Sequence, residues 1–221
     1  MQIGNKEIYE LNGIKAILSN LNIDADGSPF AYAPKDSGLE GLDYLANAGS
    51  PGNWWGIATD SDGTPYIQKE NDPAPGFYVS TTALEDPDFA ANYPARYVDS
   101  STIPFVVIPS NPEFGIELGD VGFALNLQNG ASTSFIVADI GPPHQLGEAS
   151  VAFAKNLSVN PSAKDGGVDS NTVLYIFFPG SKTTWPLDNE QILSNAYNRL
   201  LSFGGLSALK VHLPNFDWSK F

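Results

Sequence analysis

The chain has 221 residues, of which 42% are hydrophobic and 12% aromatic, and because no linker-like tract divides it we expect one domain, residues 1–221, with one substantial core. The absence of cysteine excludes a disulfide framework, a cysteine nucleophile and a thiolate metal site. Acidic residues outnumber Lys and Arg 25 to 11, for a net charge of −14, which argues against nucleic acid as a partner and suits attraction of a cationic polymer.

The apolar segments are all too short for a membrane span, which needs about 20 residues, so we expect no membrane partner. The first six residues lack the apolar core of a signal peptide. Two compartments therefore stay open: the cytoplasm, or the outside of the cell after removal of a secretion signal.

Short apolar runs separated by Gly, Pro, Asn and Asp predict a mainly β (α+β) protein. The run from Val121 to Leu127 and the run from Thr133 to Ala138 flank Asn129-Gly130, which supplies the positive φ angles of a tight hairpin turn. In chain order the predicted strands are Glu7–Leu11, Ile14–Ser19, Trp54–Thr59, Pro65–Gln68, Phe77–Thr81, Phe105–Ile108, Val121–Leu127, Thr133–Ala138 and Val173–Phe178.

Three peripheral helices are predicted. The first begins at a capping-box pattern, Ser37 with Glu40 three residues on, and ends at Gly49. The other two run over Glu148–Leu157 and Asp188–Gly204, where apolar residues recur at helical spacing. A compact β-barrel with these helices around it fits the pattern best.

The loop between the eighth strand and the second helix carries two acids. Asp139 leaves the strand and Glu148 enters the helix, while Gly141, Pro142 and Pro143 can continue neither element. Two anchored carboxylates are what glycoside hydrolysis requires. The alternative is structural: Asp139 caps a turn and Glu148 favours the positive N-terminus of the helix.

Five motifs, which follow one another along the chain in the same order as in a known family, support this interpretation. Together they resemble the chitosanases of glycoside hydrolase family 75, over roughly Ile14 to Ser181. The most specific of them is the segment with the two acids. The motifs are Asn22–Gly27, Pro104–Pro109, Gly119–Val121, Asp139–Ser150 and Phe177–Ser181.

The resemblance implies that Asp139 and Glu148 are the two essential acids and that the enzyme hydrolyses the β-1,4 bonds of chitosan with inversion. It also implies a double-psi-like barrel and secretion. We expect no cofactor, no metal ion and a monomer.

Two Asp-x-Asp-Gly stretches, Asn22–Gly27 and Asp60–Gly63, resemble the start of a calcium-binding loop, but both lack the acid that closes such a loop. Each is typical of a turn. The functional alternative is that Asp24, Asp26 or Asp62 lines a cleft and pairs with the ammonium group of glucosamine.

Trp54 and Trp55 are adjacent, so in a strand their side chains face opposite sides, and one of them is free to stack on a sugar ring. A structural role for both stays open, since large aromatic residues dominate cores. The chain has two histidines, too few for a usual zinc site. His144 lies between the two acids, where it either adjusts the pKa of a carboxyl group, contacts sugar or simply faces solvent.

The sequence therefore predicts an inverting endo-glycosidase acting on chitosan or a related amino-sugar polymer, with Glu148 as the acid and Asp139 as the base. A helix N-terminus would oppose this assignment, because it stabilises the ionised form of Glu148. Two alternatives remain: a peptidoglycan-cleaving glycosidase, and a carbohydrate-binding protein that kept the fold without the chemistry. The predicted substrate-binding residues are Asp24, Asp26, Asp62, Trp54, Trp55 and His144.

Overall fold

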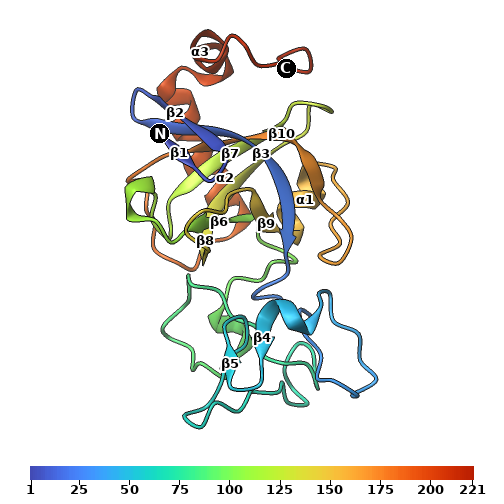
Figure 1. Cartoon of the computed structure of the whole chain (residues 1–221). Coiled ribbons are helices and arrows are strands. Elements are labelled where there is room, and N and C mark those ends of the chain that lie inside the picture. Colours follow the sequence, from blue (N-terminus) through green and yellow to red (C-terminus); the bar gives the residue numbers. More distant parts are fainter.

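Eight strands pair into one sheet in the order β1-β2-β3-β10-β7-β8-β6-β9, and a further pairing between β3 and β9 closes six of them into a barrel (Figure 1). The structure is a computed structural model that describes residues 1–221. The strands are β1 (Gln2–Ile3), β2 (Lys6–Leu11), β3 (Ile14–Asp24), β6 (Phe105–Pro109), β7 (Val121–Asn126), β8 (Ser132–Gly141), β9 (Glu148–Ser150) and β10 (Val168–Phe177).

Alternate residues of β10 explain how the barrel is filled and covered. Tyr175 and Phe177 belong to the inner core, whereas Leu174 and Ile176 belong to a second cluster that includes helix residues. This follows from the period of two along a strand, and it makes both faces of β10 apolar. In the inner core the aromatic rings of Phe114, Phe135, Phe153, Tyr175 and Phe177 contact one another in pairs.

Three helices lie outside the barrel: α1 (Val151–Asn156), α2 (Asn189–Phe203) and α3 (Gly205–His212). The third predicted helix is α2, which begins at a capping box of Asp188 and Gln191. The sequence missed α3, because Gly204 ends α2 in the left-handed conformation and a new helix starts directly after it. None of these helices combines the length and apolar character that crossing a membrane requires.

The second predicted helix begins later than expected. Glu148 lies in β9, and α1 starts at Val151 because the Ser150 side chain accepts a hydrogen bond from the backbone N–H of Phe153. Asp139 lies inside β8, which continues to Gly141. Both acids are therefore held by strands.

The first predicted helix is wrong. Residues 37–44 form bends and irregular loop, and only a short 3₁₀ helix, η1 (Leu45–Ala48), follows them. The backbone N–H groups of Leu42 and Asp43 donate to the carbonyls of Phe30 and Ala31, so hydrogen bonds to a neighbouring segment replace those of a helix. This competition is invisible in the apolar spacing on which the prediction rested.

Residues 25–100 form a lobe of loops below the barrel, blue to green in Figure 1. It contains β4 (Gly49–Ser50), β5 (Asn53–Trp54) and the 3₁₀ helix η2 (Pro94–Arg96); a further 3₁₀ helix, η3 (Pro112–Phe114), follows β6. The three strands predicted within residues 54–81 are wrong as strands. Only isolated bridges remain, at Ile57–Ser80, Thr59–Pro65 and Ile67–Tyr78.

The predicted hairpin is confirmed, since β7 and β8 pair antiparallel from Val121 with Ile136 to Leu125 with Ser132. Its connection is the longer loop 127–131 instead of a two-residue turn, and only Gly130 has a positive φ, 83°. A mainly β barrel with three peripheral helices is thus confirmed. Its double-psi connectivity stays a prediction.

Candidate active site

Sheet register places Asp139 and Glu148 in one row. Val107 of β6 pairs with Asp139 of β8 on one side and with Glu148 of β9 on the other. Paired residues of neighbouring strands point to the same face of a sheet, and two strand spacings put the Cα atoms of the two acids about 10 Å apart. The two carboxyl groups therefore approach one cavity from opposite sides.

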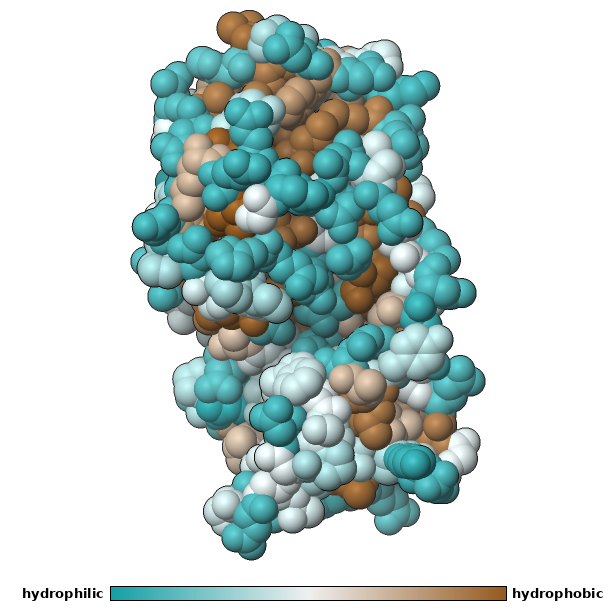
Figure 2. All heavy atoms as spheres, in the orientation of Figure 1, coloured by the Kyte–Doolittle hydropathy of each residue, from teal (hydrophilic) through white to brown (hydrophobic).

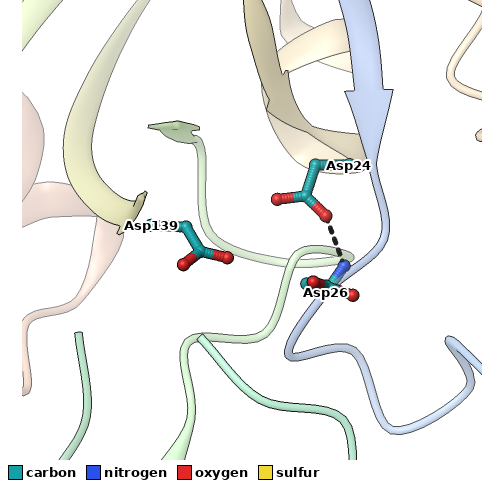
Figure 3. Close-up of side chains that lie close together, drawn as sticks. All are labelled: Asp24, Asp26 and Asp139. Atoms are coloured by element: carbon teal, nitrogen blue, oxygen red, sulfur yellow. Dashed lines mark hydrogen bonds between the residues drawn. The ribbon is translucent and has the colours of Figure 1, made fainter. Parts of the chain in front are cut away.

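Two further acids come from the end of β3. Asp24 is its last residue and Asp26 follows in the turn, and β3 runs parallel to β9 with Asn22 opposite Glu148. The carboxylate oxygens of Asp24, Asp26 and Asp139 lie within 4.8 Å of one another. Figure 3 shows Asp24 and Asp139 facing each other from two strands, with Asp26 below them.

These acids line a cavity of about 140 Å³, which we call the acid cavity. It lies where the barrel meets the lobe. Its lining comprises Asp24, Asp26, Asn47, Trp55, Val107, Asp139, Ile140, Gly141, Pro142 and Glu148. Four carboxyl groups so close together repel one another when they are ionised.

Hydrogen bonds fix three of the carboxyl groups. The Oδ1 atom of Asp139 accepts from the backbone N–H of Ala83 at 3.0 Å and of Ile140 at 2.8 Å. Asp24 Oδ1 accepts from the backbone N–H of Asp26 at 2.7 Å, and the Tyr32 hydroxyl donates to Asp26 Oδ1 at 2.5 Å. The positions of these oxygens are therefore set by the backbone and by one buried phenol.

Burial raises the pKa of Asp139 to about 6, although its two backbone hydrogen bonds act in the opposite direction. Burial, followed by the negative charges of Asp139 and Asp43, raises the pKa of Glu148 to about 7. The pKa values of Asp24 and Asp26 are also well above the usual range, chiefly through burial and then through repulsion from neighbouring carboxylates. Like charges at this spacing cannot all be ionised, so the cluster retains protons near neutral pH.

The inner side of Glu148 is apolar. Behind it lies a small cavity of about 10 Å³, whose lining includes Val106, Leu146, Tyr175 and Phe177. A carboxyl group against an apolar wall resists ionisation. A helix N-terminus lowers the pKa of an acid in its first turn. Glu148 precedes the Ser150 N-cap, and no acid lies in the first turn of α1.

Three carboxylates within this distance could also share a hard cation such as Ca²⁺ or Mg²⁺, which prefer oxygen ligands. The residues that could hold it are Asp24, Asp26 and Asp139.

The acid cavity opens into a longer depression. A hollow of about 510 Å³, the middle groove, shares Asn47, Trp55, Pro142 and Glu148 with it. A third hollow of about 530 Å³, the outer groove, continues from the middle groove through shared residues that include Gln145. The surface view shows the recess between the barrel and the lobe (Figure 2).

The predicted substrate-binding residues divide into two groups. Asp24, Asp26 and Trp55 line the acid cavity, and the Trp55 side chain is exposed. Trp54 is the last residue of β5 and packs in the lobe, with its ring centroid 6.2 Å from that of Tyr78, whereas Trp55 follows the strand in a bend.

His144 and Asp62 lie elsewhere. His144 is exposed in the outer groove and does not line the acid cavity. Asp62 is exposed in a turn whose backbone N–H groups donate to Asp60 Oδ1, and it lines none of the three hollows. The turn interpretation of Asp60–Gly63 is thus the one that the structure supports.

Sequence reasoning missed Asp43, Asn47 and Tyr32. Asp43 and Asn47 lie in the segment that was predicted as a helix, where a pair four residues apart is typical of a solvent-facing contact. Tyr32 is buried and binds Asp26. No spacing signal in the sequence points to these contacts.

Neither a scan against family models nor a search of curated proteins gives a match to this chain.

Proposed function

We propose that the protein is an inverting endo-glycosidase that hydrolyses the β-1,4 bonds of chitosan or of a related amino-sugar polymer. The observation that carries this proposal is the row of Asp139, Val107 and Glu148 across three adjacent strands. Two strand spacings separate the Cα atoms of the two acids by about 10 Å, and an inverting enzyme needs their carboxyl groups roughly 6.5–9.5 Å apart, with room for a water molecule between them. A retaining enzyme would need about 5 Å.

In the proposed reaction the protonated Glu148 donates its proton to the glycosidic oxygen while the bond from that oxygen to the anomeric carbon breaks. The ionised Asp139 removes a proton from a water molecule whose oxygen bonds to the anomeric carbon from the opposite face. Glu148 ends ionised and Asp139 ends protonated, so exchange of one proton with solvent restores the enzyme. The configuration at the anomeric carbon inverts.

The order of the two pKa values supports these roles. Glu148, with the higher pKa of about 7, is the group that stays protonated to higher pH, and Asp139, at about 6, ionises first. A general acid and a general base need such a separation to be active together. The backbone hydrogen bonds to Asp139 favour its ionised form, as the base role requires.

Charge and shape favour a cationic polymer as substrate. The net charge of −14 and the ionised carboxyl groups of the cavity would attract the ammonium groups of glucosamine units. The depression formed by the acid cavity and the two grooves is lined by more residues than one sugar ring would contact. An extended groove is typical of cleavage within a polymer chain.

Incubation of the pure protein with chitosan, chitin and peptidoglycan tests the proposal, with Glu148→Gln as the matched control. Soluble oligosaccharides from chitosan with the wild-type protein, and not with the variant, are expected. Products from peptidoglycan alone would show that peptidoglycan, and not chitosan, is the substrate. No product from any of the three would contradict glycosidase activity and favour a carbohydrate-binding protein.

A further inference from the structure

Trp55 is held rigidly although it is exposed. The residue is 62% exposed, whereas the other tryptophans of the chain are half-buried. The indole Nε1–H donates to the carbonyl of Asn47 at 2.8 Å. The backbone N–H groups of Trp55 and Gly56 both donate to the carbonyl of Ala48 at 3.1 Å. A surface indole with a fixed edge and a free face is suited to binding a flat, partly apolar ligand.

Asn47 is in turn held by Asp43. Its side-chain Nδ2 donates to Asp43 Oδ1 at 2.9 Å and to Oδ2 at 3.0 Å. Asp43 is only 8% exposed and also accepts from the backbone N–H of Tyr44 at 2.7 Å. Because a carboxylate accepts hydrogen bonds and donates none, the amide nitrogen of Asn47 faces Asp43 and the amide oxygen is left as an acceptor.

Asn47 and Trp55 lie at the junction of two hollows. Both residues line the acid cavity and the middle groove, and so does Glu148. Pro142 and Gln145 belong to the same middle groove, together with Lys164, whose charge is paired with Glu40 at 3.0 Å. A sugar unit next to the cleaved bond would therefore lie beside Trp55 and Asn47.

We propose that Asp43, Asn47 and Trp55 form a subsite for one pyranose ring of an amino-sugar chain, next to Glu148. The indole face of Trp55 packs against the C–H face of the ring. The Asn47 side-chain oxygen accepts a hydrogen bond from a hydroxyl or ammonium group of the same sugar. Asp43 does not touch the sugar and is a positioning residue that holds Asn47 and, through it, the indole. This inference rests on the proposed function and names part of its binding site.

Kinetics on fully deacetylated glucosamine oligosaccharides separate binding from chemistry. Trp55→Ala should raise KM about tenfold, the equivalent of ~1.4 kcal/mol, with kcat nearly unchanged. Trp55→Phe should recover part of this loss, since it keeps a ring without the indole N–H. Asp43→Asn and Asn47→Ser should each raise KM by a smaller factor. Tyr197→Ala, an exposed aromatic residue on α2, is the control and should leave KM unchanged.

Tryptophan fluorescence gives a readout that does not depend on turnover. Titration of the Glu148→Gln protein with the glucosamine tetramer should shift its emission, and the additional Trp55→Phe change should abolish that shift. Asn47→Ser should weaken binding of the tetramer while the protein stays folded at the assay temperature, which circular dichroism checks.

Three outcomes would overturn the subsite. An unchanged KM for Trp55→Ala in an active enzyme would remove Trp55 from binding, and so would a fluorescence shift that survives Trp55→Phe. Wild-type KM in both Asp43→Asn and Asn47→Ser would remove the positioning role. Failure of the wild-type protein to cleave any polymer would instead contradict the proposed function, and the fluorescence titration would still test the subsite.

Discussion

Glu148 and Asp139 differ in what surrounds their carboxyl groups. Asp139 accepts two backbone hydrogen bonds that favour its ionised form, while Glu148 has an apolar wall behind it and negative neighbours in front. Catalysis needs Asp139 ionised and Glu148 protonated at the same time. We therefore expect kcat/KM to be highest between pH 6 and 7, the two pKa values.

The pH profile should fall below pH 6, where Asp139 becomes protonated, and above pH 7, where Glu148 loses its proton. Initial rates on a soluble glucosamine oligosaccharide over pH 4–9 check this. Activity that stays flat to pH 9 would rule out Glu148 as the acid. In Asp139→Asn the acidic limb should disappear from any residual activity.

Asp139→Asn and Glu148→Gln should each lower kcat at least ~100-fold, because general acid or base catalysis typically contributes that much. Neither variant should unfold the protein, since a neutral amide is easier to bury than a carboxylate. Asp62→Asn, in an exposed turn outside the hollows, is the matched control and should retain activity. Loss of activity that merely follows loss of folded protein, measured by circular dichroism, would favour a structural role.

Asp24 is buried and its folded pKa is raised, so its ionisation opposes folding. When the pKa of an acid is raised in the folded state, the folded protein is most stable below the unfolded pKa of about 4. It loses stability as the pH rises from there through the folded pKa. Asp24→Asn should therefore raise the melting temperature at pH 7.5 by at least about 2 °C and by less at pH 4.5. An equal or larger gain at pH 4.5 would show that Asp24 is ionised at both pH values.

At the residue scale the sequence predicts the acids of the site better than the residues that hold the site in place. Asp139, Glu148, Asp24 and Asp26 were all expected near the site, and the acid cavity brings them together. Asp43 could not be predicted in the same way. Its contacts depend on an irregular loop whose apolar residues have the spacing of a helix. Asp62 shared its motif with Asp24 and Asp26, but a motif does not say which loop faces the cleft.

At the scale of elements, the short strand β9 decides where Glu148 lies. Gly147 precedes it with φ of 98°, and a Cβ atom there would stand 2.5 Å from Ser19 Oγ and 2.7 Å from the Asn20 carbonyl. The backbone of β9 therefore approaches β3 more closely than any side chain would allow, and the Asn22 N–H donates to the Gly147 carbonyl at 2.7 Å.

Gly147→Ala should accordingly lower both the free energy of unfolding, by ~1–3 kcal/mol, and kcat, because displacing β9 moves Glu148. Urea denaturation and steady-state rates measure the two effects. Gly13→Ala is a matched control, since Gly13 also has a positive φ but nothing lies within 4 Å of the added atom. Loss of stability with full kcat would mean that β9 does not set the position of the acid.

The long strands β8 and β10 were predictable because each contains a continuous apolar run, which a strand buried on both faces requires. β9 was not, because three residues are too few to show a period and they run directly into α1. The strand predictions in the lobe were wrong for a different reason. The short apolar runs of the lobe predict strands, but frequent Gly, Pro and Asp residues interrupt the pairing.

At the scale of the whole molecule, the site exists because the lobe returns to the barrel. The backbone N–H of Leu84 donates to the Ala138 carbonyl at 2.8 Å, and that of Ala83 donates to Asp139. Lys164 of the barrel pairs with Glu40 of the lobe. Contacts between segments so distant in sequence leave no local pattern, so the sequence predicts the barrel class and the acids but not the groove between barrel and lobe.

The stereochemistry of the first products tests the central claim most directly. Proton NMR of a soluble glucosamine oligosaccharide during hydrolysis should show the α-anomer at the new reducing end first, followed by slow mutarotation. Glu148→Gln should give no such signal in the same time. A β-anomer as the first product would contradict inversion by Asp139 and Glu148, and an α-anomer formed equally fast by Glu148→Gln would contradict the role of this pair.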